Sequence, residues 1–314
     1  MKITVTGGLG HIGSALIRSN LAPLGVEEIV VIDSLLTQRF SSLFNLNQNP
    51  KITFLDKSIE LLNNSDFKLI EGSTHLIHLA AMTDASSSVD KKQELFANNL
   101  GGTQSVVNLC KSQGIKLLLP SSTSVYGSQL SLVDENSLDL NPQSPYAECK
   151  LAEESLIKES ITTGLSGVIL RFGTIHGVSP GMRFHTAVNR FCFEYMLNKP
   201  LSVWKSAINQ YRPYLALSDA VRAIQHVITK DIFDSEIYNV LTENITLEDI
   251  ISIIEELGGR PAEIDYVDSP IMNQFSYEVS KVKFQNTGFS YQGSIQEDIA
   301  NTLKILSGIQ NVRF

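Results

Sequence analysis

The 314-residue sequence contains little of what marks proteins that work on membranes or nucleic acids. Its apolar runs all fall short of the roughly 18–20 residues that a membrane-spanning helix needs, so we expect no contact with a membrane. Positive charge is in the minority, with 25 Lys and Arg against 33 Asp and Glu. Because a nucleic-acid-binding surface needs a basic patch, we expect no nucleic acid partner either.

Cysteine is also scarce. Cys110, Cys149 and Cys192 do not have the spacing of metal ligands and cannot all pair with one another. Lys2 leads directly into a β-branched run, without the long apolar core and cleavage site of a secretory signal peptide. We therefore expect a reduced, cytoplasmic protein with no metal site, in which the three thiols are packing residues.

What the chain does have is a glycine-rich start. Gly7, Gly10 and Gly13 follow a β-branched run and precede a helical pattern, so their backbone can approach a pyrophosphate at a helix N-terminus. A second apolar run ends about twenty residues later at Asp33, whose carboxylate suits a ribose 2′-hydroxyl. Asp33 would repel a 2′-phosphate, which Arg39 in the next loop could meet, and the pattern favours NAD over NADP. The alternative is a glycine turn that binds nothing.

Strand and helix patterns alternate through the first 240 residues, which predicts an α/β fold. We expect a doubly wound parallel sheet (a Rossmann fold) with a smaller C-terminal substrate-binding lobe. The NAD-binding domain should cover residues 1–172, with 212–240 returning to it, and the lobe should take most of 173–314. The expected strands are residues 2–6, 28–32, 52–55, 75–79, 115–119, 166–170, 236–240 and 262–267. The expected longer helices are 90–113, interrupted by Gly101 and Gly102, and 146–163, 247–257 and 294–306, with Thr246 capping the third through a capping-box variant that includes Asp249.

A tyrosine and a lysine stand four residues apart in the middle of the chain, at Tyr146 and Lys150. On a helix this spacing puts both on one face, and an ammonium beside a phenol favours the phenolate. Lys150 should thus draw the pKa of Tyr146 toward neutrality, where Tyr146 could act as a general base. Tyrosine and lysine at this spacing on an ordinary helix face, with no chemical role, are the alternative.

Six motifs occur in a fixed order along the chain. They are TGGLGHIG, HLAA at 78–81, NNLGGT at 98–103, SSTSVYG, YAECK and LRFGTIHG. Together they resemble the extended short-chain dehydrogenases/reductases, and within these the NAD-dependent epimerase/dehydratase family that acts on nucleotide sugars. The resemblance covers residues 1 to about 240 and thins after Val240.

The resemblance implies which residues hold NAD. Those residues are Gly7, Gly10, His11, Ile12, Gly13, Asp33, Asp56, Leu79, Ala80, Ala81, Asn99, Tyr146 and Lys150. For Asp56 the alternative is a helix cap, and Asn99 is either a structural or a cofactor-side residue. His78 is expected to be a packed strand residue and not a catalyst.

The resemblance also implies a catalytic set of Ser122, Tyr146 and Lys150, with Ser122 sharing the hydrogen bond to the reacting sugar hydroxyl. The alternative for Ser122 is a strand-end serine that satisfies its own backbone. The implied substrate-binding residues are Thr83, Ser122, Thr174, Arg183, Asn189 and Arg212. A solvated helix start is the alternative for Arg183 and Asn189, and Trp204 is expected in the core more than against a base.

Four departures from the family pattern bear on the reaction. Thr123 and Ser124 stand where family dehydratases carry Asp and Glu, acids that protonate a leaving hydroxyl, so a 4,6-dehydratase is disfavoured. Thr174 and His176 replace an Asn and a Tyr, which leaves the diphosphate or sugar contacts open.

The function implied by the resemblance is an NAD-dependent nucleotide-sugar epimerase, working on a nucleotide-diphosphate sugar through transient oxidation to a keto sugar. One alternative is a nucleotide-sugar dehydrogenase or reductase with net redox change, and another is a non-catalytic NAD-binding regulator. The helices at 90–113 and 146–163 carry apolar residues on more than one face, and relatives pair these helices across a twofold axis. We therefore expect a homodimer.

Overall fold

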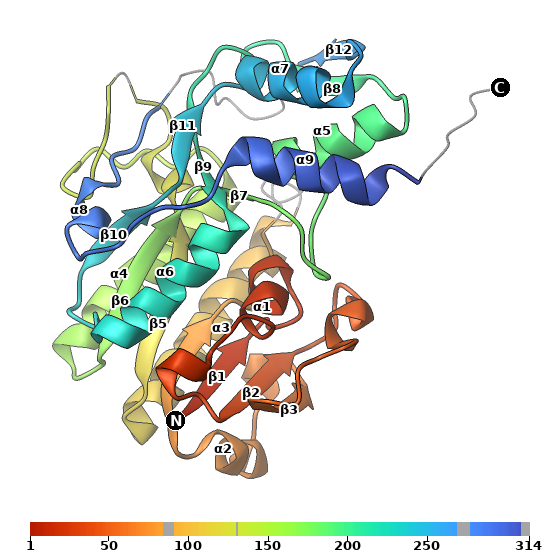
Figure 1. The fold of residues 1–314 in the computed structure, drawn as a ribbon. Helices are drawn as coiled ribbons and strands as arrows, with labels where there is room; N and C mark the ends of the chain where they lie inside the picture. The colour runs from red at the N-terminus through yellow and green to blue at the C-terminus, as the bar shows by residue number, and fades with distance from the viewer. Residues whose placement is uncertain (84–90, 130, 269–276, 309–314) are drawn as a thin grey trace.

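Seven parallel strands form the central sheet, in the order β10-β6-β5-β4-β1-β2-β3 (Figure 1). The structure is a computed structural model that describes residues 1–83, 91–129, 131–268 and 277–308. The strands of the sheet are β1 (Lys2–Thr6), β2 (Glu28–Asp33), β3 (Lys51–Asp56), β4 (Ser73–His78), β5 (Lys116–Ser122), β6 (Gly167–Phe172) and β10 (Ile237–Val240). All seven strands predicted for this sheet are confirmed within a few residues of their expected bounds.

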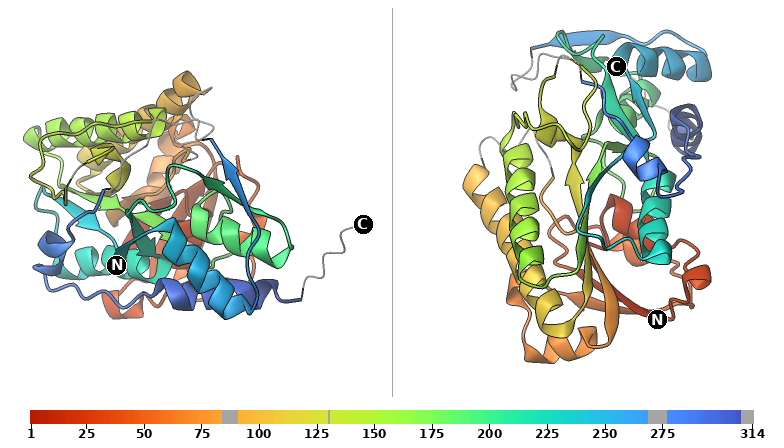
Figure 2. Two further views of the ribbon diagram at one scale, coloured as in Figure 1. Left: turned by 90° about the horizontal axis from the view of Figure 1, so that it is seen from above. Right: turned by 90° about the vertical axis from the view of Figure 1, so that its left-hand side faces the viewer.

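Helices cover both faces of this sheet. Figure 2, in its right-hand view, shows α3 (Lys92–Gln113) and α4 (Pro145–Thr162) on one side and α1 (His11–Leu16) with α6 (Leu217–Lys230) on the other. The predicted doubly wound α/β fold is therefore confirmed. Because the sheet is buried on both faces, its strands are apolar along most of their length instead of alternating.

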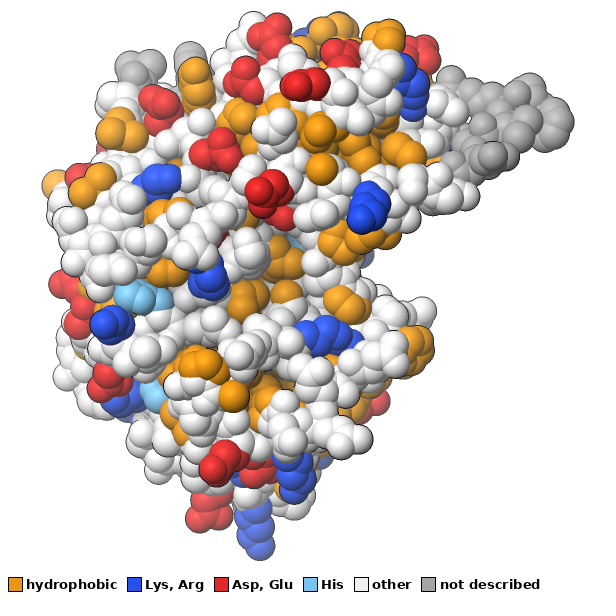
Figure 3. All heavy atoms as spheres, viewed as in Figure 1, with side chains coloured by type: hydrophobic (Ala, Val, Ile, Leu, Met, Phe, Trp, Pro, Cys, Tyr) orange, Lys and Arg blue, Asp and Glu red, His pale blue; other side chains and the backbone are white. Residues whose placement is uncertain are grey.

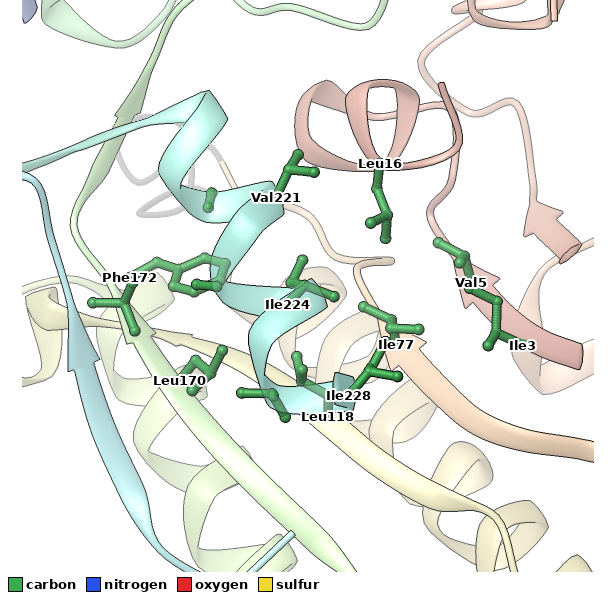
Figure 4. Close-up of a cluster of buried hydrophobic side chains, with 14 of the residues drawn as sticks. Ile3, Val5, Leu16, Ile77, Leu118, Leu170, Phe172, Val221, Ile224 and Ile228 are labelled. Carbon is green, nitrogen blue, oxygen red and sulfur yellow. The ribbon is translucent and has the colours of Figure 1, made fainter. Parts of the chain in front are cut away.

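The core on the α1 and α6 side shows why this layering is stable. Leu16 of α1 and Val221, Ile224 and Ile228 of α6 pack onto inward-facing side chains of the strands, as Figure 4 shows. The strand residues are Ile3, Val5, Ile77, Leu118, Leu170 and Phe172. Residues 212–240 thus supply the edge strand β10 and the covering helix α6 of this sheet. The first strand of the same segment, β9 (Arg212–Ala216), lies in a different sheet with β7 (Thr174–His176) and β11 (Glu243–Ile245).

A second lobe lies beyond the carboxyl ends of the parallel strands, at the top of Figure 1. It contains α5 (Ala187–Met196), α7 (Leu247–Gly258), α9 (Ile295–Leu306) and the parallel pair β8 (Leu201–Trp204) and β12 (Ile264–Val267), packed around a hydrophobic cluster of its own. Thr246 caps α7 in a reciprocal capping box with Asp249, as predicted. The remaining short helices are α2 (Asn64–Ile70), α8 (Val282–Gln285) and the 3₁₀ turns η1 (Ala22–Leu24), η2 (Phe40–Leu43), η3 (Ile59–Leu61) and η4 (Thr123–Tyr126).

The predicted interruption at Gly101 and Gly102 is wrong, because α3 runs through both glycines without a break. Glycine weakens a helix interior only by about 1 kcal/mol, and the packing of α3 against α4 and the sheet outweighs that cost. Asp90, the predicted start of this helix, lies outside the described residues. The three cysteines are buried and unpaired. Within the described part of the chain, no helix combines the length and the apolar character needed to cross a membrane.

Candidate active site

A large cleft opens where the carboxyl ends of the parallel strands meet the second lobe. Its volume is about 750 Å³, in the upper range for small-molecule and cofactor sites. In the space-filling view of Figure 3 the molecule is hollowed between the upper lobe and the sheet domain. Seven basic side chains line the cleft against one carboxylate, Asp33, among the described residues; they are Arg39, Lys57, Lys91, Lys150, Arg183, Arg190 and Arg212. This balance suits a ligand that carries several phosphate charges.

The glycine loop forms one end of the cleft, and its geometry excludes larger residues. Gly7 has φ of 65°, and a Cβ there would lie 2.5 Å from the backbone nitrogen of Ala80. A Cβ on Gly13 would lie 2.6 Å from the carbonyl oxygen of Gly7. Gly10 faces the cleft at the start of α1, and a Cβ there would meet the oxygen of Gly7 at 3.2 Å. The loop is thus a bare backbone cradle at a helix N-terminus, which fits the pyrophosphate of a dinucleotide.

Asp33 at the end of β2 is held by the loops on either side of it. Its Oδ2 accepts a hydrogen bond from the amide of Leu9 at 3.0 Å, and its Oδ1 accepts one from the amide of Leu35 at 3.0 Å. Arg39 lies beside it, where burial lowers the pKa of the guanidinium and the nearby Asp33 charge opposes that change. Asp33 therefore both orders the glycine loop and presents a carboxylate to the cleft.

Ser122 is the last residue of β5 and lines the cleft. Its Oγ accepts hydrogen bonds from the amide of Ser124 at 3.2 Å and from the Oγ of Ser124 at 2.9 Å. Ser122 thus caps the turn η4, in line with the alternative of a strand-end serine that satisfies local backbone, and it lines the same cleft as Tyr146. Neighbouring Thr123 is buried, with its hydroxyl donating to the Phe172 carbonyl at 3.3 Å.

Tyr146 and Lys150 come together at the start of α4. Ser144 caps this helix, with its Oγ accepting from the amide of Ala147 at 3.2 Å, and Pro145 occupies the first helical position. Tyr146 is half-buried in the cleft wall, and Lys150 is buried one turn further along. The Nζ of Lys150 donates to the carbonyl oxygen of Pro120 at 3.2 Å.

The expected lowering of the Tyr146 pKa is wrong. Burial raises the pKa of the phenol, and although the Lys150 and Arg183 charges act to lower it, the net direction is upward. The charge of Lys150 is offset because its Nζ lies 2.7 Å from the Oε2 of Glu153. Burial alone would lower the pKa of Lys150, but Glu153, Tyr146 and Cys149 together raise it above its ordinary value, so the ammonium is retained.

Four of the predicted substrate-side residues lie in the cleft wall along with Ser122. Thr83, Thr174, Arg183 and Arg212 line the cleft, and the Arg212 guanidinium lies 5.2 Å from the centre of the Tyr277 ring. Trp204, expected in the core, is instead half-buried in the cleft wall, because β8 ends at the rim of the second lobe.

Three of the predicted site residues do not line the cleft: Asp56, Asn99 and Asn189. Asp56 is exposed at the end of β3, and neighbouring Lys57 and Ser58 face the cleft in its place. The side chain of Asn99 is buried and exchanges two hydrogen bonds with the backbone of Met82. Asn189 is buried and donates to the carbonyl oxygen of Arg183 at 3.0 Å. Both asparagines thus stabilise the backbone of residues that line the cleft, Met82 and Arg183, without lining it themselves.

His11 lines the cleft and is bonded to the segment that follows β7. Its Nε2 lies 2.9 Å from the carbonyl oxygen of Gly177, and its backbone carbonyl accepts from the hydroxyl of Ser179 at 2.9 Å. The hydroxyl of Ser14 donates to Ser179 as well, at 3.0 Å. These contacts join the glycine loop to the segment that follows β7.

Sequence reasoning missed a buried layer of charge beneath the catalytic candidates. Arg171 of β6 makes a bidentate pair with Glu154 of α4, at 2.9 and 2.7 Å, and Ser121 donates to the same carboxylate at 2.6 Å. The adjacent Glu153 pairs with Lys150. The sequence signal for this layer was the pair of consecutive glutamates, Glu153 and Glu154, within the predicted helix.

Comparisons with known proteins agree with this arrangement. A sequence model described as the NAD dependent epimerase/dehydratase family matches residues 3–240. An uncharacterized UDP-glucose epimerase, YtcB of Bacillus subtilis, is 31% identical over 98% of this chain and 99% of its own length. The crystal structure of UDP-glucuronic acid 4-epimerase from Bacillus cereus, in complex with UDP-glucuronic acid and NAD, is 26% identical with a TM-score of 0.86, covering 98% of this chain and 99% of that one.

A more distant relative is larger. A trifunctional UDP-glucose 4,6-dehydratase/UDP-4-keto-6-deoxy-D-glucose 3,5-epimerase/UDP-4-keto-L-rhamnose-reductase of Arabidopsis thaliana is 26% identical over 96% of this chain. The present chain spans 47% of the length of that protein.

Proposed function

The chain belongs to the NAD-dependent epimerase/dehydratase family, and we propose that it inverts carbon 4 of a UDP-sugar with Tyr146 as the base. It is an NAD-dependent nucleotide-sugar epimerase. The observation that supports the site most directly is that Tyr146 and Lys150 share the first turns of α4 at the cleft wall, with Ser122 and the glycine cradle lining the same cleft.

The residues present fit NAD as the cofactor. Gly7, Gly10 and Gly13 leave room for the pyrophosphate, and Asp33 presents a carboxylate where a ribose 2′-hydroxyl can donate to it. Leu79, Ala80 and Ala81 line the cleft after β4. When bound, NAD would accept a hydride from the sugar carbon and return it to the opposite face of that carbon, which would invert its configuration with no net redox change.

The protein's own part in this reaction is proton transfer and orientation. Tyr146, as phenolate, takes the proton of the reacting sugar hydroxyl at its own oxygen and later gives it back to the same sugar oxygen. The Ser122 hydroxyl donates a hydrogen bond to that oxygen and fixes its position. Lys150 holds a positive charge near the phenol, and this charge by itself acts to lower the Tyr146 pKa, against the larger effect of burial.

Cations on the far side of the cleft suit the nucleotide diphosphate. Arg212 and Arg190 line the cleft on the second lobe, and guanidinium groups bind phosphate oxygens in pairs. Trp204, in the same wall, offers a ring face on which a base can stack. We assign the diphosphate to Arg212 and the sugar to Thr83, Thr174 and Arg183.

Elimination of water is disfavoured by the residues after Ser122. A 4,6-dehydratase needs acids to protonate the leaving hydroxyl, and these positions hold Thr123 and Ser124. Thr123 is buried and bonded to a backbone carbonyl, and Ser124 donates to Ser122. Neither side chain can supply a proton as a carboxylic acid does.

The experiment that tests this function is incubation with UDP-glucose, UDP-glucuronic acid and dTDP-glucose in separate reactions. Products are followed by mass spectrometry and NMR, and the cofactor by its absorbance. We expect a product of unchanged mass, inverted at carbon 4, with no net NADH. Loss of two hydrogens with accumulation of NADH would establish a dehydrogenase instead, and loss of water a dehydratase.

We also propose that the protein works as a cytoplasmic homodimer. The buried, unpaired thiols of Cys110, Cys149 and Cys192 suit a reducing compartment. The helices α3 and α4 pack side by side on one face of the sheet, where a second copy could add its own pair.

A further inference from the structure

Glu153 is a buried acid that the reaction scheme above does not use. It lies on α4 one turn after Lys150, and its side chain is 0% exposed. One oxygen, Oε2, lies 2.7 Å from the Nζ of Lys150. The other, Oε1, accepts a hydrogen bond from the hydroxyl of Thr103 on α3 at 2.9 Å. A carboxylate in such a place is costly to bury unless its partners are fixed.

The contacts of Glu153 continue through the protein to β1. The Nε2 of His78 lies 3.2 Å from the Thr103 hydroxyl, and its Nδ1 lies 2.7 Å from the hydroxyl of Thr6. Since Thr103 donates to Glu153, His78 must donate through Nε2–H and accept from Thr6 through Nδ1. Burial, followed by the Lys150 charge, lowers the pKa of His78 to about 3, so this ring is neutral. This chain of hydrogen bonds from Glu153 to Thr6 therefore contains no charged group other than Glu153.

We propose that Glu153 is a positioning residue for the Tyr146–Lys150 pair. Glu153 anchors the Lys150 ammonium and cancels part of its charge, so that Tyr146 holds its proton more tightly than it would beside Lys150 alone. This inference rests on the proposed function, in which Tyr146 is the base. It adds to that function a residue on the same helix, seven positions from the tyrosine, that sets how readily the base becomes available.

Few charged groups face the Tyr146–Lys150 pair. Tyr146 is under the influence of Lys150 and of Arg183 from the second lobe, both of which favour the phenolate, and of Glu153 and Cys149, which oppose it. Lys150 is faced by Glu153, Tyr146, Cys149 and the neutral His78. Burial raises the pKa of Cys149 to about 12, so this thiol is uncharged at neutral pH. Glu153 is thus the one anion within this group, and its removal leaves the cations unopposed.

The test is a titration of Tyr146 in the full-length protein that needs no substrate. Tyrosinate absorbance is recorded against pH for the wild type and for Glu153→Gln, and the signal of the matching Tyr146→Phe variant is subtracted from each. We expect the midpoint of Tyr146 to fall by about one pH unit in Glu153→Gln, and Glu153→Asp to restore most of the wild-type value. If Glu153→Gln does not fold, Glu153→Met makes the same change in charge with a similar volume.

The adjacent acid provides a matched control. Glu154→Gln also removes a buried carboxylate from α4, but one that pairs with Arg171 instead of Lys150, so it should leave the midpoint of Tyr146 in place. Thr103→Val, which keeps the Glu153 charge and removes its hydrogen bond, should do the same. An unchanged or higher midpoint in Glu153→Gln would overturn the proposal, as would an equal shift in Glu154→Gln. Since no turnover is measured, failure here is distinct from failure to find epimerase activity.

Discussion

The imidazole of His11 is bonded to the carbonyl oxygen of Gly177, with 2.9 Å between Nε2 and the oxygen, and so joins two segments 166 residues apart. The first segment forms the glycine cradle, and the second leads from β7 to Arg183. A buried histidine in the cradle therefore couples the shape of the cofactor loop to the start of the second lobe.

This contact predicts a loss of stability in acid. Burial, together with the Arg183 and Arg39 charges, lowers the pKa of His11 from 6.5 to about 4, although the Gly177 bond opposes this. The unfolded chain thus binds a proton at His11 before the folded protein does, and stability that is complete above pH 6.5 falls progressively as the pH drops toward 4. Urea unfolding at pH 7 and at pH 5 should show a smaller loss of unfolding free energy in His11→Gln than in the wild type. Parallel losses in the two proteins would contradict this.

Removal of the phenol oxygen tests the base. We expect Tyr146→Phe to lower kcat by about 10²–10⁴, the usual worth of a positioned general base. The Km for the sugar nucleotide should change little, because the hydroxyl acts mainly in the transition state. Ser122→Ala should have a milder effect, since it removes one hydrogen bond. A folded, NAD-binding Tyr146→Phe protein with wild-type turnover would exclude Tyr146 as the base.

Cofactor choice depends on Asp33. NAD should bind far more tightly than NADP, because the carboxylate accepts from a ribose hydroxyl and repels a phosphate. Asp33→Asn removes the negative charge and keeps an acceptor for one of the two amides, Leu9 or Leu35, so it should narrow the difference between the NAD and NADP affinities while keeping one of the two loop hydrogen bonds. Isothermal titration calorimetry with both cofactors measures this, and equal affinities for the wild type would refute the assignment.

The glycines should differ in what their substitution disturbs. Gly13→Ala would place a Cβ 2.6 Å from backbone atoms, so the loop must move and the protein should lose stability. Gly10→Ala meets one backbone oxygen at 3.2 Å and otherwise projects toward the cleft. We expect Gly10→Ala to weaken NAD binding at least tenfold with little change in Tm. The prediction fails if both variants lose NAD affinity only in proportion to their loss of stability.

Assembly is tested at α3 and α4. We expect light scattering at micromolar concentration to give the mass of a homodimer. Ala97 is exposed on α3, and Ala97→Arg would add a buried charge to a twofold contact there, so it should shift the protein toward monomer. Leu257→Arg, on exposed α7 surface in the second lobe, is the matched control and should leave the mass unchanged. A monomeric wild type would disprove this assembly.

Local patterns were enough to predict much of the sheet domain. The β-branched runs, the glycine loop and the Thr246–Asp249 capping box each depend on neighbours within a few residues, and each is found as expected. The strands β7, β8, β9 and β11 have three to five residues each, and short strands with distant partners leave little trace in a sequence. Trp204 was misplaced for the same reason, since its surroundings come from the way β8 meets the cleft.

The sequence by itself determined the α/β fold, the glycine cradle and the pairing of Tyr146 with Lys150, because a helix brings residues four apart onto one face whatever surrounds it. Only the tertiary structure decided the electrostatic state of that pair. Packing α4 against α3 and the sheet buries Lys150 and Glu153 together, and the same packing raises the pKa of Tyr146 that the isolated helix would have lowered. Solvation and distant charge depend on every element that closes around a group, and spacing along one helix does not contain them.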